Sequence, residues 1–177
     1  MRIYLRPIQL EDGMYIVKWR NSPQVISHCF DKTPVTLESN ERFYKTYIET
    51  GKYRQFIVER VEETTCVVSY AIATVYLKDI DISNHCCELC IFTSDDEEWN
   101  TESQTMAIKM LLEKAFTEYD MKRVYTYVFA THQNEIELMY NSGFHKEKVL
   151  EKGTVDLNGE YIDVYLLSIV KENYKKN

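Results

Sequence analysis

The amino-acid sequence predicts a single α/β (α+β) domain, and three observations support this fold class. With 177 residues the chain can build one sizeable hydrophobic core. Its apolar residues switch several times between the period of two that is typical of strands and the period of about 3.6 that is typical of helices. Only 5 glycines and 3 prolines interrupt it, and no repeat or linker divides it. We therefore expect one domain over residues 1–170 and a polar tail at residues 171–177.

The N-terminal part of the chain predicts one strand followed by two helices. Polar and apolar residues alternate over residues 2–6, as they do in a half-buried strand. Asp12 is a candidate cap for the first helix, which we expect to end or bend at Ser22-Pro23. A stripe of aromatic residues predicts the second helix at residues 37–49.

Three strands are expected next, in quick succession. Residues rich in β-branched and aromatic side chains form three runs, at 55–60, 66–77 and 84–93. The polar residues 62–65 between the first two runs predict a hairpin turn.

In the second half of the chain, predicted helices alternate with predicted strands. One helix is expected over residues 105–119, a strand buried on both faces over 123–130, and a short helix over 134–141. Asn158-Gly159 joins two further strand-like runs and is the strongest hairpin signal in the chain. The predicted order is β-α-α-β-β-β-α-β-α-β-β.

Charge and composition exclude several classes of protein. A net charge of −7 argues against binding to nucleic acid or to an anionic membrane, because a protein that binds either one needs a positively charged surface. The N-terminus has no apolar signal-peptide core, and no apolar run is long enough to span a bilayer. The aromatic surplus of 14 Tyr and 7 Phe favours a homodimer. Five unevenly spaced cysteines indicate reduced thiols and a cytoplasmic protein: Cys29, Cys66, Cys86, Cys87 and Cys90.

Residues 121–125, 128–130 and 141–144 carry a resemblance to a known family. Their order and spacing resemble, without a gap, the GNAT family of acetyl-CoA-dependent N-acetyltransferases. The resemblance implies a mixed, mostly antiparallel central sheet with helices on both faces. It also implies acetyl transfer to a primary amine of a small molecule, an amino sugar or a peptide N-terminus. Residues 19–23 look like the branch that acetylates ribosomal-protein N-termini or amino sugars.

The family binds the pyrophosphate of acetyl-CoA on backbone N–H groups at the start of its central helix. Here Glu102 and Gln104 replace the small residues of that loop, and residues 95–98 add four negative charges nearby. Thr101 and Gln104 match a capping box, so this helix start is expected to cap itself. An alternative function is therefore a catalytically inactive GNAT-like binding or regulatory module with lost or weakened CoA binding. The resemblance implies these cofactor contacts: Ile91, Phe92, Thr93, Asn100, Thr101, Glu102, Ser103, Gln104 and His132.

By the same resemblance, Glu88 is the candidate general base, acting on the acceptor amine directly or through water. A buried carboxylate with a raised pKa would suit this role, and the alternative is a carboxylate paired across the sheet. The tyrosine that often serves the family as general acid corresponds to Met139, and Tyr140 comes one residue later. Because one residue is about 100° around a helix, Tyr140 is expected to point elsewhere.

Trp19 and Arg20 are candidates for one wall of the acceptor pocket, again by resemblance. The alternatives are a core position for Trp19 and a surface ion pair for Arg20. His132 is a candidate for the cofactor end of the site, or forms a hydrogen bond within a loop.

Cysteine, histidine and glutamate side chains, the types that bind zinc, are concentrated at residues 85–90. In a strand Cys86 and Cys90 would share a face but lie about 13 Å apart, which is too far to hold one ion. No metal site is therefore expected.

Overall fold

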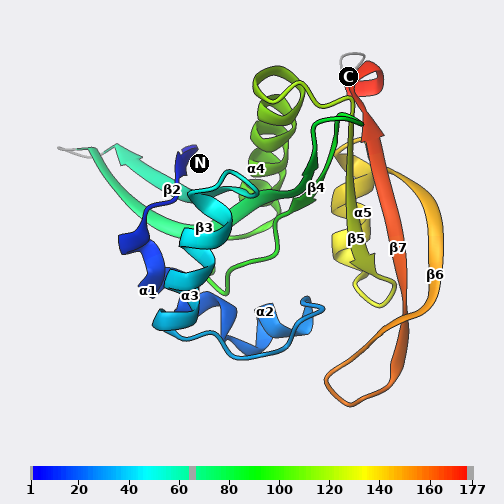
Figure 1. Cartoon of the computed structure of the whole chain (residues 1–177), viewed down its shortest axis with the longest axis horizontal. Coiled ribbons are helices and arrows are strands. Elements are labelled where there is room, and N and C mark those ends of the chain that lie inside the picture. Colours follow the sequence, from blue (N-terminus) through cyan, green and yellow to red (C-terminus); the bar gives the residue numbers. More distant parts are fainter. Residues whose placement is uncertain (1, 64–66, 175–177) are drawn as a thin grey trace.

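The computed structural model describes residues 2–63 and 67–174, which form one seven-stranded sheet covered by helices on both faces (Figure 1). The strand order in space is β1-β2-β3-β4-β5-β7-β6. All neighbouring strands are antiparallel except β4 and β5, which run parallel. This confirms the predicted mixed, mostly antiparallel sheet. The strands are β1 (Arg2–Pro7), β2 (Arg54–Glu63), β3 (Val67–Asp81), β4 (Cys86–Cys90), β5 (Arg123–Phe129), β6 (His145–Val155) and β7 (Tyr161–Val170).

Helices precede the second strand, connect the central strands and close the chain. They are α1 (Gly13–Arg20), α2 (Pro23–Ser27), α3 (Leu37–Phe43), α4 (Thr101–Glu113), α5 (Gln133–Asn141) and α6 (Lys171–Tyr174). Helices α3 and α4 each continue into a π-helical turn, at Tyr44–Ile48 and Lys114–Glu118. Within residues 2–63 and 67–174, no helix is both long and apolar enough to cross a membrane.

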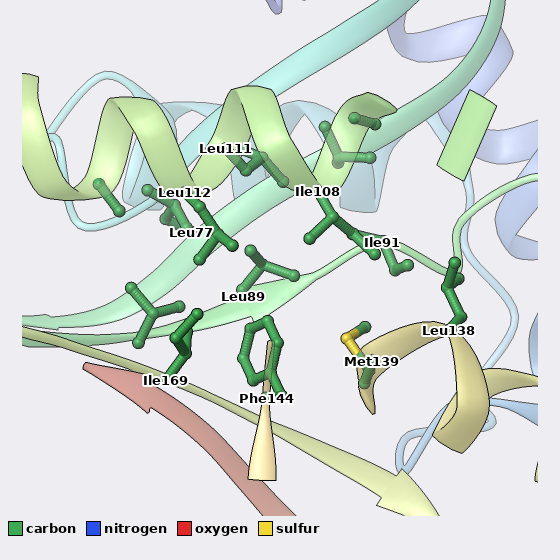
Figure 2. Packing of buried hydrophobic residues seen from close by; sticks show 14 of the residues in the cluster. Leu77, Leu89, Ile91, Ile108, Leu111, Leu112, Leu138, Met139, Phe144 and Ile169 are labelled. Carbon is green, nitrogen blue, oxygen red and sulfur yellow. The ribbon is translucent and has the colours of Figure 1, made fainter. Parts of the chain in front are cut away.

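Two hydrophobic clusters show which helices cover which face of the sheet. On β2, Phe56 and Val58 join the large cluster beneath α4 and α5, whereas Ile57 between them joins a small cluster with Ile16 and Trp19 of α1. Because successive side chains of a strand point to opposite faces, α1 lies on the face opposite to α4 and α5. Figure 2 shows the large cluster, in which side chains of α4, β3, β4 and α5 meet.

The sheet opens between its two parallel strands. Pairing between β4 and β5 comprises Cys86 with Arg123, Cys87 with Val124 and Glu88 with Tyr125. Both strands continue beyond these pairs, so they separate after Glu88, and α4 is the crossover that connects them (Figure 1). The opening lies in the middle of the sheet and gives access to side chains of both strands.

The two local predictions at the N-terminal helices have different outcomes. Helix α1 ends at Arg20, just before Ser22-Pro23, as expected, and Pro23 also begins a further helix, α2, with Ser22 as the cap that accepts a hydrogen bond from the N–H of Val25. Proline suits the first position of a helix because its missing N–H would have no partner there. The Asp12 side chain does not cap α1, because its carboxylate pairs with Arg6 and accepts from the backbone N–H of Gln9.

Of the two predicted hairpins, the one at Asn158-Gly159 is confirmed, because it joins the antiparallel strands β6 and β7. Gly159 there has a φ of 83°, which favours glycine. Strands β2 and β3 are antiparallel neighbours as well, but residues 64–66 between them, Cys66 included, lie outside the described part of the chain. The other four cysteines are free thiols: Cys29, Cys86, Cys87 and Cys90.

Candidate functional site

Three cavities follow the opening between β4 and β5. The central cavity, about 220 Å³, is lined by residues that include Glu88 and Cys90 of β4 and Thr126 of β5. An acceptor-side cavity of about 410 Å³ shares Arg20, Asp31, Tyr76, Lys78 and Thr93 with it. An α5-side cavity of about 560 Å³ shares His28, Phe92 and Glu135 with it. The shared residues place the central cavity between the other two.

Glu88 is paired across the sheet and also lies at a cavity. Its side chain lines the central cavity and the residue is only 5% exposed. On the neighbouring strand, Lys78 is its register partner, and the Lys78 Nζ lies 3.2 Å from Glu88 Oε2. Burial raises the pKa of Glu88, and the Lys78 ammonium and the Cys90 thiol act against this rise. The carboxylate is therefore paired across the sheet and also faces a cavity.

The start of α4 caps itself, as predicted, but through a different residue. Asn100 is the N-cap, and its Oδ1 accepts from the N–H groups of Glu102 and Ser103 at 3.1 and 3.3 Å. The capping box of Thr101 and Gln104 does not form, because Gln104 Nε2 donates instead to the carbonyl of Trp99. Asparagine is among the best N-caps, and its extended backbone conformation here directs the side chain onto those amides.

Of the predicted cofactor contacts at this helix start, Asn100, Thr101 and Gln104 line the α5-side cavity. Ser103 is fully buried, and its hydroxyl donates to the carbonyls of Glu98 and Asn100. Glu102 is exposed. The side chain of Ser103 is thus hydrogen-bonded within the loop, and its backbone N–H donates to Asn100.

The acidic run before α4 carries less free negative charge than the sequence suggested. Glu98 forms an ion pair with Arg60, at 2.6 Å, and Asp96 Oδ1 accepts from the backbone N–H of Glu98. Asp96 thereby stabilises the turn that leads into the helix, because its carboxylate satisfies a loop amide. The ion pair with Arg60 thus offsets one of the four negative charges of residues 95–98.

The three predicted cofactor residues after β4 all line the central cavity. Ile91 is buried in the large hydrophobic cluster, and Phe92 stacks on the ring of His28 with centroids 5.2 Å apart. Thr93 is 3% exposed, and its hydroxyl has no hydrogen-bond partner in the described part of the chain. A buried polar group without a partner is a candidate for binding a ligand.

The two predicted acceptor residues are placed differently. Trp19 is 1% exposed and packs with Ile8, Ile16 and Ile57, so its ring lies in the small hydrophobic cluster and lines none of the three cavities. Its large apolar side chain is stabilised there by burial. Arg20 lines both the central and the acceptor-side cavity, and its guanidinium donates to the Cys29 thiol.

Helix α5 contributes a different acidic group from the one that the family pattern suggests. Met139 is fully buried in the large cluster beside Phe144 (Figure 2). Tyr140 is 43% exposed. Glu135 of the same helix faces the cavities, with its Oε2 2.9 Å from Nδ1 of His28. His132 is close to both, with its ring centroid 3.9 Å from that of His28.

Sequence reasoning missed His28 and Glu135. The spacing of three between His132 and Glu135 was the available signal, because residues three apart on a helix are neighbours. His28 lies 107 residues from Glu135 and gave no such signal.

Comparison with known proteins identifies the family. The model of the Acetyltransferase (GNAT) domain matches residues 2–145. The chain belongs to the GNAT family. A spermidine N(1)-acetyltransferase from Vibrio cholerae is 22% identical to this GNAT chain, over 98% of the chain and 95% of the relative. An uncharacterized N-acetyltransferase p20 from Bacillus licheniformis is 27% identical over the same shares.

Solved structures agree with this GNAT assignment. The spermidine N-acetyltransferase from Vibrio cholerae in complex with CoA and spermine has a TM-score of 0.86 at 22% identity, covering 98% of both chains. A dodecameric structure of spermidine N-acetyltransferase from Vibrio cholerae has a TM-score of 0.79 at 22% identity, covering 97% of this chain and 95% of that one.

The expected branch was that of ribosomal-protein or amino-sugar acetyltransferases, whereas these relatives are named as spermidine N-acetyltransferases. The expectation rested on residues 19–23, and the structure gives these residues structural roles. Trp19 is a core residue, and Ser22-Pro23 begins α2.

Proposed function

We propose that this GNAT protein transfers the acetyl group of acetyl-CoA to a primary amine of a linear polyamine. The observation that carries the proposal is the buried carboxylate of Glu88 in the central cavity, between two larger cavities. A carboxylate with a raised pKa is a better proton acceptor than an exposed one, so Glu88 is suited to take a proton from the attacking amine. The names of the relatives support this reaction class.

Acetyl-CoA is assigned to the α5-side and central cavities. The α5-side cavity reaches the start of α4, where the helix dipole favours a pyrophosphate. Asn100 occupies the N–H groups of Glu102 and Ser103, so its side chain must turn away before these amides can bind a phosphate. In the central cavity, the Thr93 hydroxyl has no hydrogen-bond partner in the described part of the chain and is a candidate donor to the acyl group.

The acceptor-side cavity suits an alkylammonium chain. Aromatic rings of Phe43 and Tyr53 line it, together with the carboxylate of Asp31. Tyr53 also lines an adjoining cavity of about 780 Å³, which adds the carboxylates of Asp79 and Asp81. Arg20 and Lys78 also line the acceptor-side cavity, and Lys52 lines the adjoining one, so the carboxylates there are partly offset by cations. The aromatic faces of Phe43 and Tyr53 are therefore the feature that supports an alkylammonium acceptor, because such faces attract cations.

Lys78 shows how an ammonium group fits against the base. Its Nζ contacts Glu88 within the central cavity, and the side chain lines the acceptor-side cavity as well. The same cation keeps the pKa of Glu88 from rising further, because an opposite charge nearby favours the ionised carboxylate. Glu88 can therefore be ionised, as a general base must be, although it is buried.

The experiment has two steps. Calorimetric titration with acetyl-CoA should give saturable binding, with an affinity in the range of about 1 µM to 1 mM that is typical of enzyme substrates. Mass spectrometry should then detect monoacetylated spermidine or spermine after incubation with acetyl-CoA, and little product from glucosamine or a peptide N-terminus. Absence of binding, or of any acetylated amine, would contradict the proposal. Product from amino sugar or peptide alone would contradict the acceptor class.

The alternative of a catalytically inactive binding or regulatory module receives no support from the relatives, which are named as acetyltransferases. Its structural motivation, the self-capped helix start, rests on the side chain of Asn100.

A further inference from the structure

His28, His132 and Glu135 form a cluster of metal-ligating side chains that the proposed transfer reaction does not use. His28 follows α2, His132 immediately precedes α5, and Glu135 lies in the first turn of α5. One ligand atom of each residue lies within 4.8 Å of those of the other two. We propose that this cluster binds one divalent transition-metal ion, and that zinc is its best match.

The distances fit a single ion. Glu135 Oε2 lies 2.9 Å from Nδ1 of His28 and 3.4 Å from Nδ1 of His132. A tetrahedral zinc ion with bonds of about 2.0–2.1 Å needs ligand atoms about 3.3 Å apart. Small side-chain movements are therefore enough to accept it. Two imidazoles and one carboxylate are also a donor set that zinc uses when a fourth position stays open.

The side chains are held in place and partly shielded from water. The Glu135 side chain is 8% exposed, and those of His28 and His132 are 23% and 21% exposed. Phe92 stacks on the His28 ring, and Phe129 packs against the His132 ring with centroids 5.3 Å apart. Rings fixed by packing lose little freedom when they bind an ion, which favours affinity.

One ring nitrogen also lacks a partner. Nδ1 of His132 is buried, and although Glu135 is near it, no hydrogen bond to it forms within residues 2–63 and 67–174. A buried polar atom without a partner is costly, and a metal ion would remove this cost by accepting its lone pair.

The position of the cluster predicts what the ion would do. His28 and Glu135 line both the central and the α5-side cavity, where acetyl-CoA is assigned. An ion there would occupy the passage between the two cavities, so zinc and acetyl-CoA should compete. This consequence rests on the proposed function, whereas the metal site itself does not.

The direct test uses the full chain, stripped of metal with a chelator and kept reduced with a phosphine. Calorimetric titration with Zn²⁺ should give one ion per chain. His132→Asn and Glu135→Gln should each weaken binding at least about tenfold, because each removes a ligand or its charge. His145→Gln, which changes an exposed histidine of β6, should leave affinity unchanged. Circular dichroism melting should show that all three variants remain folded.

Cobalt gives a second readout. Co²⁺ bound to the cluster should show d–d absorption without the thiolate charge-transfer band that a cysteine ligand would produce. The inference is overturned if no saturable binding of one ion occurs, if His132→Asn and Glu135→Gln bind as tightly as the unchanged chain, or if the thiolate band appears.

The competition is tested separately. Saturating Zn²⁺ should weaken acetyl-CoA binding by the unchanged chain and have little effect on the His132→Asn variant. If zinc binds at the cluster but acetyl-CoA never binds, the proposed function fails and the metal site stands. If both ligands bind independently, the competition is wrong.

Discussion

Two opposing effects act on the pKa of Glu88. Burial disfavours the charged carboxylate, and the Lys78 ammonium favours it. The net effect is a pKa above that of an exposed glutamate. A group in this state can hold a proton briefly and return it, which is what transfer from an amine requires.

Glu88→Gln should lower kcat by roughly 10²–10⁴-fold, the range by which general bases contribute, because glutamine cannot accept the proton. The KM for acetyl-CoA should change little, since the substitution keeps size and shape. Steady-state rates from quantified acetylated polyamine measure both constants. Glu151→Gln, at an exposed position of β6, is the matched control and should leave kcat unchanged. A Glu88→Gln variant with full kcat would remove Glu88 from its role.

The raised pKa of Glu88 also predicts a pH profile. Only the ionised carboxylate accepts a proton, so kcat/KM should fall as pH drops through this pKa, at a higher pH than for an exposed glutamate. The substrate amine loses its own proton as pH rises, which adds a second slope over the same range. As pH is lowered from neutral to acidic, kcat/KM should therefore fall more steeply in the unchanged chain than in Glu88→Gln. Parallel profiles would contradict the assignment.

At the scale of single residues, the sequence predicted the positions whose neighbours are local and missed those set by tertiary contacts. Glu88 could be named as a candidate because the strand that contains it is visible in the sequence, and because the family pattern has a glutamate at that position. Trp19 could not be assigned between core and pocket, because a short helix does not show which face it buries. The pairing of His28 with Glu135 depends on how α2 and α5 meet, which no local pattern encodes.

Among the elements, the start of α4 controls access to the proposed cofactor site. Asn100 stabilises this start and simultaneously occupies the amides that a pyrophosphate would need. Helix stability and cofactor binding therefore compete for the same N–H groups.

Asn100→Ala should lower the free energy of unfolding by about 1 kcal/mol, because the cap is lost. The same change should tighten acetyl-CoA binding, since the amides of Glu102 and Ser103 become free of the cap. Chemical denaturation and calorimetry measure the two effects.

Asn100→Asp is the matched comparison. Aspartate caps as well as asparagine, so stability should be kept, but its charge should weaken acetyl-CoA binding by repelling the phosphates. If Asn100→Ala weakened binding as much as Asn100→Asp, the asparagine side chain would be part of the binding surface.

The sequence predicted the kinds of elements well, and it missed mostly their ends. Strands and long helices were visible because their apolar period extends over many residues. Helix α2 was missed because five residues are too few to show a period, and Ser22-Pro23 was interpreted as an end. The start of α4 was placed late because residues 101–104 are polar and the periodic face begins after them. The opening between β4 and β5 depends on pairing between strands, so only the family resemblance could indicate it.

At the scale of the whole molecule, the β6–β7 hairpin extends from one edge of the sheet (Figure 1). It carries apolar side chains exposed by a third or more of their surface: Val149, Val155, Leu157 and Tyr161. Exposed apolar side chains gathered on one element favour association.

We therefore expect this chain to form a homo-oligomer of at least two copies. Light scattering coupled to size-exclusion chromatography should give a mass well above 21.1 kDa. A Leu157→Asp, Tyr161→Asp double variant should shift the population toward the monomer, because burying the new charges is costly. Ile82→Asp changes an exposed apolar residue outside the hairpin and should not shift it. A monomer in the unchanged chain would contradict the expectation.

The short parallel pairing of β4 with β5 also bears on how the protein comes to fold. Strands β1–β4 pair in chain order, and β5 joins β4 only after a crossover that spans residues 91–122. Because a chain is synthesised from its N-terminus, β1–β4 leave the ribosome before β5 does. During synthesis, a chain that has emerged only through β4 would already carry Glu88 but would still lack the wall of its cavity.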